Sequence, residues 1–338
     1  MNRAWNSLLT AVTAVLQLSA CSVAPMTYMR TFGPAADPIT TLGWGLTFLC
    51  SAVVIIIGAL VLIPALRARS PKAAISCLAI ARAGGGLPWL YVGVGLSTLA
   101  LLGIVVWTLL TLRAVSSPSQ PTAFTIEIRA HQWWWEARYI GDPPQRTFIT
   151  ANELHIPVGQ PVRLELIADD VIHSFWIPAL AGKTDVIPGQ TNIAWLEADK
   201  AGTYRGQCTE YCGEQHAHMA LFAIAEPTPA FRKWWSEQLN RAAQPTSDRQ
   251  AQGEYLFAER CGACHTIRGT GAGGILGPDL THLMSRHTIG AGTLPNNPRS
   301  LASWIANAQG SKPGCRMPPI AVSRPELAAI AAYVQTLN

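Results

Sequence analysis

Charged side chains are scarce in this chain. They make up 13% of its 338 residues, whereas ordinary soluble domains have about 25%. Hydrophobic residues account for 49%. This composition argues against a purely soluble protein, and membrane segments are expected. The net charge of +5 is modest and gives no indication of a nucleic-acid partner.

Two long stretches lack charge altogether. The first runs from Thr41 to Leu66, and the second from Leu87 to Leu112. Each exceeds the roughly 20 apolar residues that an α-helix needs to cross a bilayer. A soluble helix would show a polar face, which makes two buried core helices the weaker interpretation. The sequence therefore predicts a transmembrane helix hairpin over residues 41–112.

Acidic residues are absent between these two stretches, where four basic residues occur: Arg67, Arg69, Lys72 and Arg82. A short basic loop stays on the cytoplasmic side of a membrane. Both flanks then lie outside, so everything after Leu112 is predicted on the periplasmic face of a bacterial inner membrane.

The first 20 residues are predicted to be a processing signal rather than part of the fold. A short apolar run ends in Leu18-Ser19-Ala20-Cys21, which looks like the secretory signal of a bacterial lipoprotein. The mature chain would begin at a lipid-carrying Cys21, and residues 21–40 would form a periplasmic segment. An uncleaved membrane anchor is the alternative, because short apolar segments near an N-terminus serve both purposes.

Residues 113–226 are predicted to form a β domain. Apolar and polar residues alternate in Thr125–Arg129 and Val162–Leu166, and Leu221–Ala225 is a short apolar run. Such runs, bounded by Pro and Gly, are typical of strands. We expect an antiparallel β-sandwich or barrel, followed by a polar, partly helical connector over residues 227–249 in which Phe231–Trp235 packs on the β domain.

Soft metal ligands gather between Cys208 and Met219. This stretch contains two thiols, two imidazoles and a thioether, which copper prefers and calcium or magnesium does not. The spacing excludes a zinc ribbon, which would need a second Cys-x2-Cys pair. A disulfide between Cys208 and Cys212 is the plainer alternative for an exported chain.

Three segments in order, Asp170–Pro178, Lys183–Gly189 and Cys208–Met219, together resemble the copper domain of cytochrome c oxidase subunit II. The resemblance implies a cupredoxin-like β-sandwich with a binuclear copper centre, CuA. The implied ligands are the side chains of His173, Cys208, Cys212, His216 and Met219 and the backbone carbonyl of Glu210.

The resemblance gives these ligands different roles. The two cysteine thiolates would bridge the copper ions, and His173 and His216 would each hold one ion. Met219 and the Glu210 carbonyl would be weak outer ligands. His218 competes with His216, and the family pattern favours His216.

Residues near the copper ligands are also assigned by the resemblance. Three tryptophans follow one another in His131–Trp135, and neighbours in a strand point to opposite sides, so at least one is expected at the surface. Trp133 would be the point at which electrons enter, whereas packing explains the other two equally well. The Glu210 carboxylate would help to hold magnesium at the border with subunit I. Asp170, beside His173, is expected to guide a basic cytochrome or simply to be solvated.

Residues 250–338 contain the motif Cys261-Gly-Ala-Cys264-His265. In a Cys-x2-Cys-His motif the thiols attach haem c covalently and the histidine ligates its iron. With a helical lead-in at Gly253–Glu259, this part resembles an all-α class I cytochrome c. A thioredoxin-like motif is disfavoured because the region lacks a βαβ pattern.

The sixth iron ligand is predicted to be Met317. It lies in Arg316-Met317-Pro318-Pro319, which resembles the Met-Pro loop of these cytochromes, before an expected helix at Arg324–Leu337. The alternative, Met284, reads as a core residue of a helix. Cys315 is assigned no function.

Together, these features look like subunit II of a caa-type cytochrome c oxidase. Electrons would pass from a cytochrome c or an upstream respiratory complex to haem c, then to CuA and then to subunit I, where oxygen is reduced to water and protons are pumped. Subunits I and III and membrane lipid are the implied partners. Where many subunit II chains have a proton-delivering glutamate, three residues before Trp89, this chain has Gly86, which leaves that role open.

Three other functions explain less of the sequence. A quinol oxidase subunit II would have lost Cys208 and Cys212. A periplasmic copper carrier would have no attached cytochrome, and a CuA-containing nitrous oxide reductase would not need two membrane spans.

Overall fold

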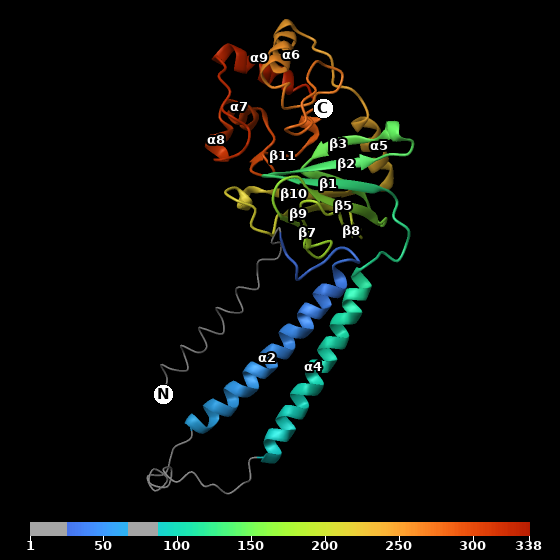
Figure 1. Ribbon diagram of the computed structural model, residues 1–338, viewed down its shortest axis with the longest axis vertical. Coiled ribbons are helices and arrows are strands. Elements are labelled where there is room, and N and C mark those ends of the chain that lie inside the picture. The colour runs from blue at the N-terminus through green and yellow to red at the C-terminus, as the bar shows by residue number, and fades with distance from the viewer. Residues whose placement is uncertain (1–25, 67–86) are drawn as a thin grey trace. The chain divides into compact units, whose positions relative to one another are not determined.

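The computed structural model describes residues 26–66 and 87–338 (Figure 1). The predicted signal, Cys21, the basic loop and Gly86 lie outside the described residues. The chain divides into two compact units. One is Asp37–Ser117, and the other joins the described residues up to Ala36 with Pro118–Asn338.

Two long helices form the first unit, α2 (Asp37–Leu66) and α4 (Leu87–Val115). They contain the two predicted uncharged stretches and extend slightly beyond them. Their most apolar windows have mean hydropathies of 2.9 and 2.1, with no buried residue in either. The helices touch where the Trp107 ring of α4 leaves no room for a Cβ at Gly45 of α2. Both are long and apolar enough to cross a membrane.

The second unit begins with a β-sandwich. One sheet has the strand order β3-β2-β1-β5-β8, a second has the order β4-β10-β9, and β6 pairs with β7. Every second residue of β1 and β5 is buried, which gives these strands one face toward a shared core. The strands are β1 (Thr125–His131), β2 (Trp134–Ile140), β3 (Phe148–Ala151), β4 (Glu153–Pro157), β5 (Val162–Ala168), β6 (His173–Phe175), β7 (Thr184–Val186), β8 (Asn192–Leu196), β9 (Gly202–Gln207) and β10 (Ala220–Glu226).

The expectation of an antiparallel sandwich is wrong for two strand pairs. β1 runs parallel to β5, and β4 runs parallel to β10. Both pairs join strands that are distant in the chain, and parallel neighbours need such long connections. Alternation in the sequence reports which face is buried but not the direction of the neighbouring strand.

The connector after the sandwich packs on it, as expected from its aromatic residues. Helix α5 (Thr228–Gln238) buries Phe231 and Trp235 in the core of the sandwich. The ring of Trp234 stacks on that of His155 of β4, with centroids 4.0 Å apart. The connector is therefore part of the folded unit.

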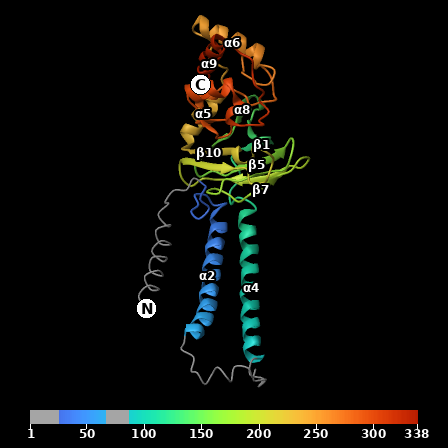
Figure 2. The same cartoon turned by 90° about the vertical axis from the view of Figure 1, so that its left-hand side faces the viewer.

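A second core lies in the C-terminal helical domain, where α6 and α9 pack side by side (Figure 2). A Cβ at Gly253 of α6 would collide with the carbonyl oxygen of Ala329, so only glycine permits this close approach. Ser323 and Glu326 form a capping box at the start of α9. The elements are α6 (Asp248–Arg260), β11 (Thr288–Ile289), β12 (Leu294–Pro295), α7 (Pro298–Ala306), α8 (Ala308–Ser311) and α9 (Arg324–Val334).

The sandwich and the helical domain contact each other within this unit. The buried carboxylate of Glu153 in β4 accepts hydrogen bonds from the backbone N–H groups of His287 (2.7 Å) and Thr288 (3.1 Å). The backbone N–H of Ala220 donates to the carbonyl of Ala291 at 3.1 Å. These contacts bring the β11–β12 hairpin onto the β4–β10 sheet.

Candidate metal and haem centres

Two cysteines and two histidines converge in the sandwich. The Sγ atoms of Cys208 and Cys212 are 3.8 Å apart. The Nδ1 atom of His173 lies 3.8 Å from Cys208 Sγ, and the Nδ1 atom of His216 lies 3.5 Å from Cys212 Sγ. His173, Cys208 and Cys212 are buried, and their ligand atoms all lie within 4.8 Å of one another.

The weaker predicted ligands border the same cluster. The thioether sulfur of the fully buried Met219 is 3.9 Å from Cys212 Sγ, and the Glu210 carbonyl oxygen is 3.3 Å from Cys208 Sγ. The structure thus brings the whole predicted ligand set together. His218 instead directs its Nδ1 toward Gln215 Oε1 at 2.6 Å.

The chain reaches this geometry through a loop held between strands. The loop leaves β9 at Cys208 and returns at Met219 just before β10, and the Cys208 N–H donates to the Met219 carbonyl at 3.0 Å. The Thr209 N–H donates to the carbonyl of Ser174 in β6 at 3.1 Å, next to His173. Gly213 turns the loop with φ +114°, a backbone conformation that favours glycine.

The sulfur atoms are suited to a soft metal ion rather than to a disulfide. A disulfide needs an S–S distance of about 2.05 Å, whereas both cysteines here are free. The hydrogen bond between the two thiol groups lowers the pKa of Cys208 and raises the pKa of Cys212. A bound cation would favour both thiolates. The donor set of thiolates, imidazoles and a thioether fits copper.

Asp170 orients the first histidine of the cluster. Its Oδ1 lies 2.8 Å from Nε2 of His173, which leaves Nδ1 facing the sulfur atoms. Burial by itself raises the pKa of Asp170, but hydrogen bonds from His173, Val171 N–H and Gln132 N–H bring it to about 2. The expectation of a solvated carboxylate is wrong, because this side chain is only 11% exposed and accepts these hydrogen bonds. Guidance of a basic cytochrome by Asp170 stays a prediction.

Trp133 lies in the turn between β1 and β2 and is buried. Its indole Nε1 donates to the Cys212 carbonyl at 3.0 Å, and the side chain of Gln132 donates to the same oxygen at 2.8 Å. Trp134 is the partly exposed member of the tryptophan cluster, and Trp135 is fully buried. Trp133 is therefore connected to the copper loop without lying at the surface of this chain.

The Cys-x2-Cys-His motif has the features of a haem c site. Nδ1 of His265 lies 2.9 Å from the Pro278 carbonyl, which leaves Nε2 as the ring nitrogen for a metal. Burial lowers the pKa of His265 and so favours the neutral, ligating ring. Nearby, Ile275 and Leu276 are 82% and 74% exposed, an apolar surface that a haem would cover.

Two family descriptions match this chain. Residues 140–225 match cytochrome c oxidase subunit II, periplasmic domain, and residues 250–338 match cytochrome c. The chain belongs to the cytochrome c oxidase subunit II family, with a cytochrome c domain fused to it. The sandwich is thus the cupredoxin-like domain of a subunit II, as expected, and the helical domain is its cytochrome c. The matched families imply copper and haem c as cofactors.

Curated relatives carry the same family name. Cytochrome c oxidase subunit 2 of Alkalihalophilus pseudofirmus is 39% identical over 215 residues, which are 63% of this chain and 61% of the relative. The Bacillus subtilis protein is 33% identical over 205 residues, 58% of this chain and 56% of the relative. This subunit II therefore spans less than two thirds of the length of these curated relatives.

Among solved structures, the periplasmic domain of subunit II of cytochrome oxidase from Bradyrhizobium japonicum is similar to this chain. The two sequences are 30% identical, the match covers 36% of this chain and 96% of that one, and the TM-score is 0.33.

The two methionines of the cytochrome domain of this subunit II differ in their surroundings. Met284 lies in the short turn Leu283–Ser285 and packs against the helical core, as a core residue would. Met317 is half-buried, and its carbonyl accepts a hydrogen bond from Gln309 Nε2 at 2.8 Å. Gln309 also donates to Cys315 Sγ at 3.3 Å, so the loop before Met317 is held in place.

Proposed function

We propose that this subunit II relays electrons from a donor through haem c to a binuclear CuA centre and on to subunit I of a haem-copper oxidase. There, oxygen would be reduced to water with proton pumping. The observation that carries the proposal is the meeting of two cysteines, two histidines and a methionine in one mostly buried cluster. The same folded unit contains the haem-attachment motif.

The chain's own residues prepare the copper site. Cys208 and Cys212 would bridge the metal pair, and His173 and His216 would each bind one ion through Nδ1. Met219 and the Glu210 carbonyl would be the outer ligands. When bound, copper supplies one-electron redox chemistry, and buried ligands anchored by neighbouring strands change little in position between its oxidation states.

In the cytochrome domain, Cys261 and Cys264 would attach the haem, and His265 and Met317 would ligate its iron. Histidine–methionine ligation raises the haem potential. Trp133 would act as the relay into the copper site, since its indole is hydrogen-bonded to the residue that contributes one bridging thiolate.

The subunit would lie in a membrane and contact other subunits of the oxidase. Helices α2 and α4 would cross the inner membrane and place the copper and cytochrome domains on the periplasmic face, with Cys21 carrying lipid. Subunits I and III would be the partners, and the Glu210 carboxylate would complete a magnesium site at the border with subunit I. The donor would be a cytochrome c or an upstream respiratory complex.

Metal analysis and spectroscopy of the intact, purified oxidase test the proposal. We expect about two copper ions and one c-type haem per chain, together with a near-infrared band and the many-line EPR spectrum of an electron shared by two copper ions. A single-copper EPR spectrum, or a pigment with haem but no copper, would refute the electron relay through CuA.

A further inference from the structure

Lys312 is a buried cation between the copper and cytochrome domains. It follows α8 and is 3% exposed. Its Nζ donates hydrogen bonds to the carbonyl oxygens of Trp133 (2.7 Å), His218 (2.7 Å) and Gly290 (3.0 Å). The first two carbonyls belong to the copper domain and the third to the cytochrome domain.

The surroundings of Lys312 are unusual for a lysine. Its ammonium group offers three protons, and three backbone carbonyls accept them. Among the described residues, no carboxylate lies within ion-pair distance of it. Burial lowers the pKa of Lys312 to about 8, so the desolvated charge costs the fold free energy. The three hydrogen bonds to carbonyls on both domains offset this cost.

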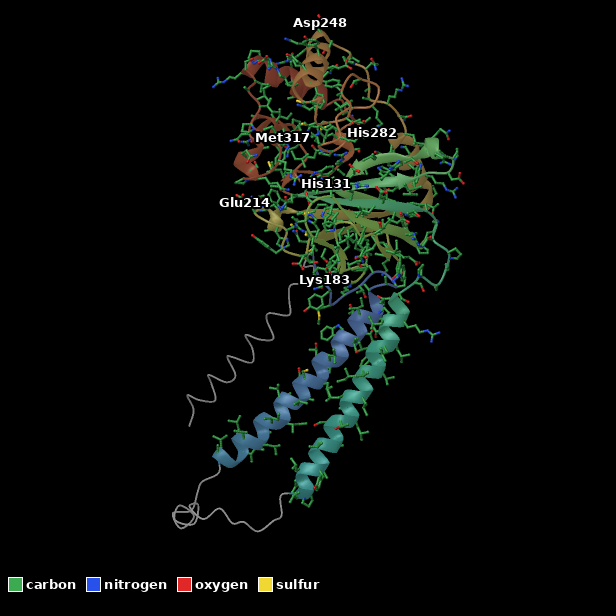
Figure 3. The ribbon with its side chains drawn as sticks, in the orientation of Figure 1. His131, Lys183, Glu214, Asp248, His282 and Met317 are labelled. Carbon is green, nitrogen blue, oxygen red and sulfur yellow. The ribbon has the colours of Figure 1, made fainter. Side chains whose placement is uncertain are left out.

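Other contacts surround this one and hold the same two domains together. The Arg316 guanidinium lies 3.2 Å from Asp170 Oδ2 and 3.1 Å from Gln132 Oε1. Gly314, with φ +78°, lies against the Glu214 side chain of the copper loop. Figure 3 labels Glu214 and, on the cytochrome domain, Met317, the proposed haem ligand three residues after Gly314.

Lys312 and the copper cluster are linked through one residue. Lys312 Nζ donates a hydrogen bond to the backbone oxygen of Trp133, and the indole Nε1 of Trp133 donates one to the carbonyl of Cys212. The loop that bears Met317 and the loop that bears a bridging thiolate are thus joined by two successive hydrogen bonds across the domain boundary.

We propose that Lys312 is a positioning residue that fixes the cytochrome domain on the turn containing Trp133. The haem of the cytochrome domain would then pass electrons to the copper site across a fixed interface between the two domains. The inference rests on the proposed electron relay. A domain moving freely on its linker would reach a productive arrangement only part of the time, and the measured transfer rate falls in proportion to that fraction.

The test uses the assembled oxidase with three substitutions. Lys312→Met keeps most of the length of the side chain and removes the hydrogen bonds, and Lys312→Arg keeps a donor with a positive charge. Lys233→Met is the control, because Lys233 of α5 is 77% exposed and pairs only with Glu237 of its own helix among the described ion pairs. Haem c is photoreduced, and its reoxidation is followed together with the near-infrared copper band.

We expect Lys312→Met to slow electron transfer from haem c to copper roughly tenfold, because a buried, hydrogen-bonded cation is lost from an interface. Lys312→Arg should recover part of the rate, and Lys233→Met should match the wild type. An unchanged rate in Lys312→Met, or a loss that Lys312→Arg does not reduce at all, overturns the inference.

The haem and copper spectra separate this result from the proposed function. If the wild type contains both centres and Lys312→Met transfers electrons at the wild-type rate, the proposed electron relay is retained and the proposed role of Lys312 is wrong. If Lys312→Met does not accumulate in cells, Arg316→Gln is used in the same measurement. The Arg316 side chain is 62% exposed, so its substitution should not prevent folding. Its removal should also slow transfer, and an unchanged rate would contradict the fixed interface.

Discussion

At the scale of single residues, the proposed copper ligands differ in how firmly the protein holds them. His173 is fixed by Asp170 on one ring nitrogen and faces sulfur with the other. Met219 has no comparable polar anchor, and its sulfur lies at the edge of the cluster, 3.9 Å from Cys212 Sγ. Strong ligands should hold the metal, and a weak thioether should adjust its electronic properties.

This difference predicts the effect of Met219→Leu. Copper should remain bound at the wild-type amount, whereas its redox potential should shift, because a weak axial ligand tunes the metal rather than retains it. Metal analysis combined with a redox titration of the near-infrared band measures both. Complete loss of copper from the variant would contradict the role given to Met219.

Haem attachment gives a second prediction for a single residue. Cys264→Ala removes one of the two proposed thioether bonds and should strongly reduce the haem that stays with the chain on a denaturing gel. Cys315→Ala is the matched control, because Cys315 lies in the same domain outside the motif and is held by Gln309. Equal haem staining in the two variants would count against the Cys261–His265 site.

Residue types indicated the stretch that contains most of the proposed copper ligands, but not the residues that position them. The Cys208–Met219 stretch is recognisable because its chemistry is concentrated in twelve consecutive residues. Lys312 contacts Trp133 across 179 positions of the chain, and no local pattern signals such a contact. Asp170 lies three positions before His173 in the sequence, yet its hydrogen bond to His173 depends on a turn that the sequence does not reveal.

At the scale of elements, predictions succeed where one physical constraint acts along the chain. Absence of charge predicted the helices α2 and α4, and period-two alternation predicted β1 and β5. The parallel pairing of β1 with β5 was missed, because strand neighbours depend on long-range packing. The helix over Arg324–Leu337 was expected at its observed start and ends three residues earlier, at Val334.

The crossing of α6 and α9 gives a prediction at this scale. In Gly253→Ala the new Cβ would meet the Ala329 carbonyl and lie 2.8 Å from Tyr333 Cβ, so the helices must separate. Overpacking of this kind costs about 1–3 kcal/mol. Thermal unfolding of the cytochrome domain, followed by haem absorbance, should shift to lower temperature.

Gly273→Ala is the control for this crossing, since an added Cβ there meets nothing within 4 Å. Its unfolding temperature should stay close to that of the wild type. If the two variants unfold at the same temperature, the close helix contact is not what stabilises the domain.

At the scale of the whole molecule, the copper domain and the cytochrome domain share buried polar contacts. Glu153 is only 2% exposed, yet its partners His287 and Thr288 belong to the other domain. A buried carboxylate without these donors would be unfavourable, so the Glu153 side chain depends on hydrogen bonds from the cytochrome domain in this arrangement. The two domains are therefore expected to be coupled in stability.

Glu153→Ala tests this coupling. The change leaves the backbone N–H groups of His287 and Thr288 without their acceptor in the interface, which costs about 1–3 kcal/mol per unsatisfied group. Hydrogen exchange of these two amides should become faster, while exchange in the core of α6 should change little. Glu165→Ala removes a carboxylate that pairs with Arg163 on the same sandwich and is 35% exposed, so it should leave both regions near the wild-type rates. Unchanged protection of His287 and Thr288 in Glu153→Ala would mean that the cytochrome domain is held by other contacts, with Lys312 the foremost among them.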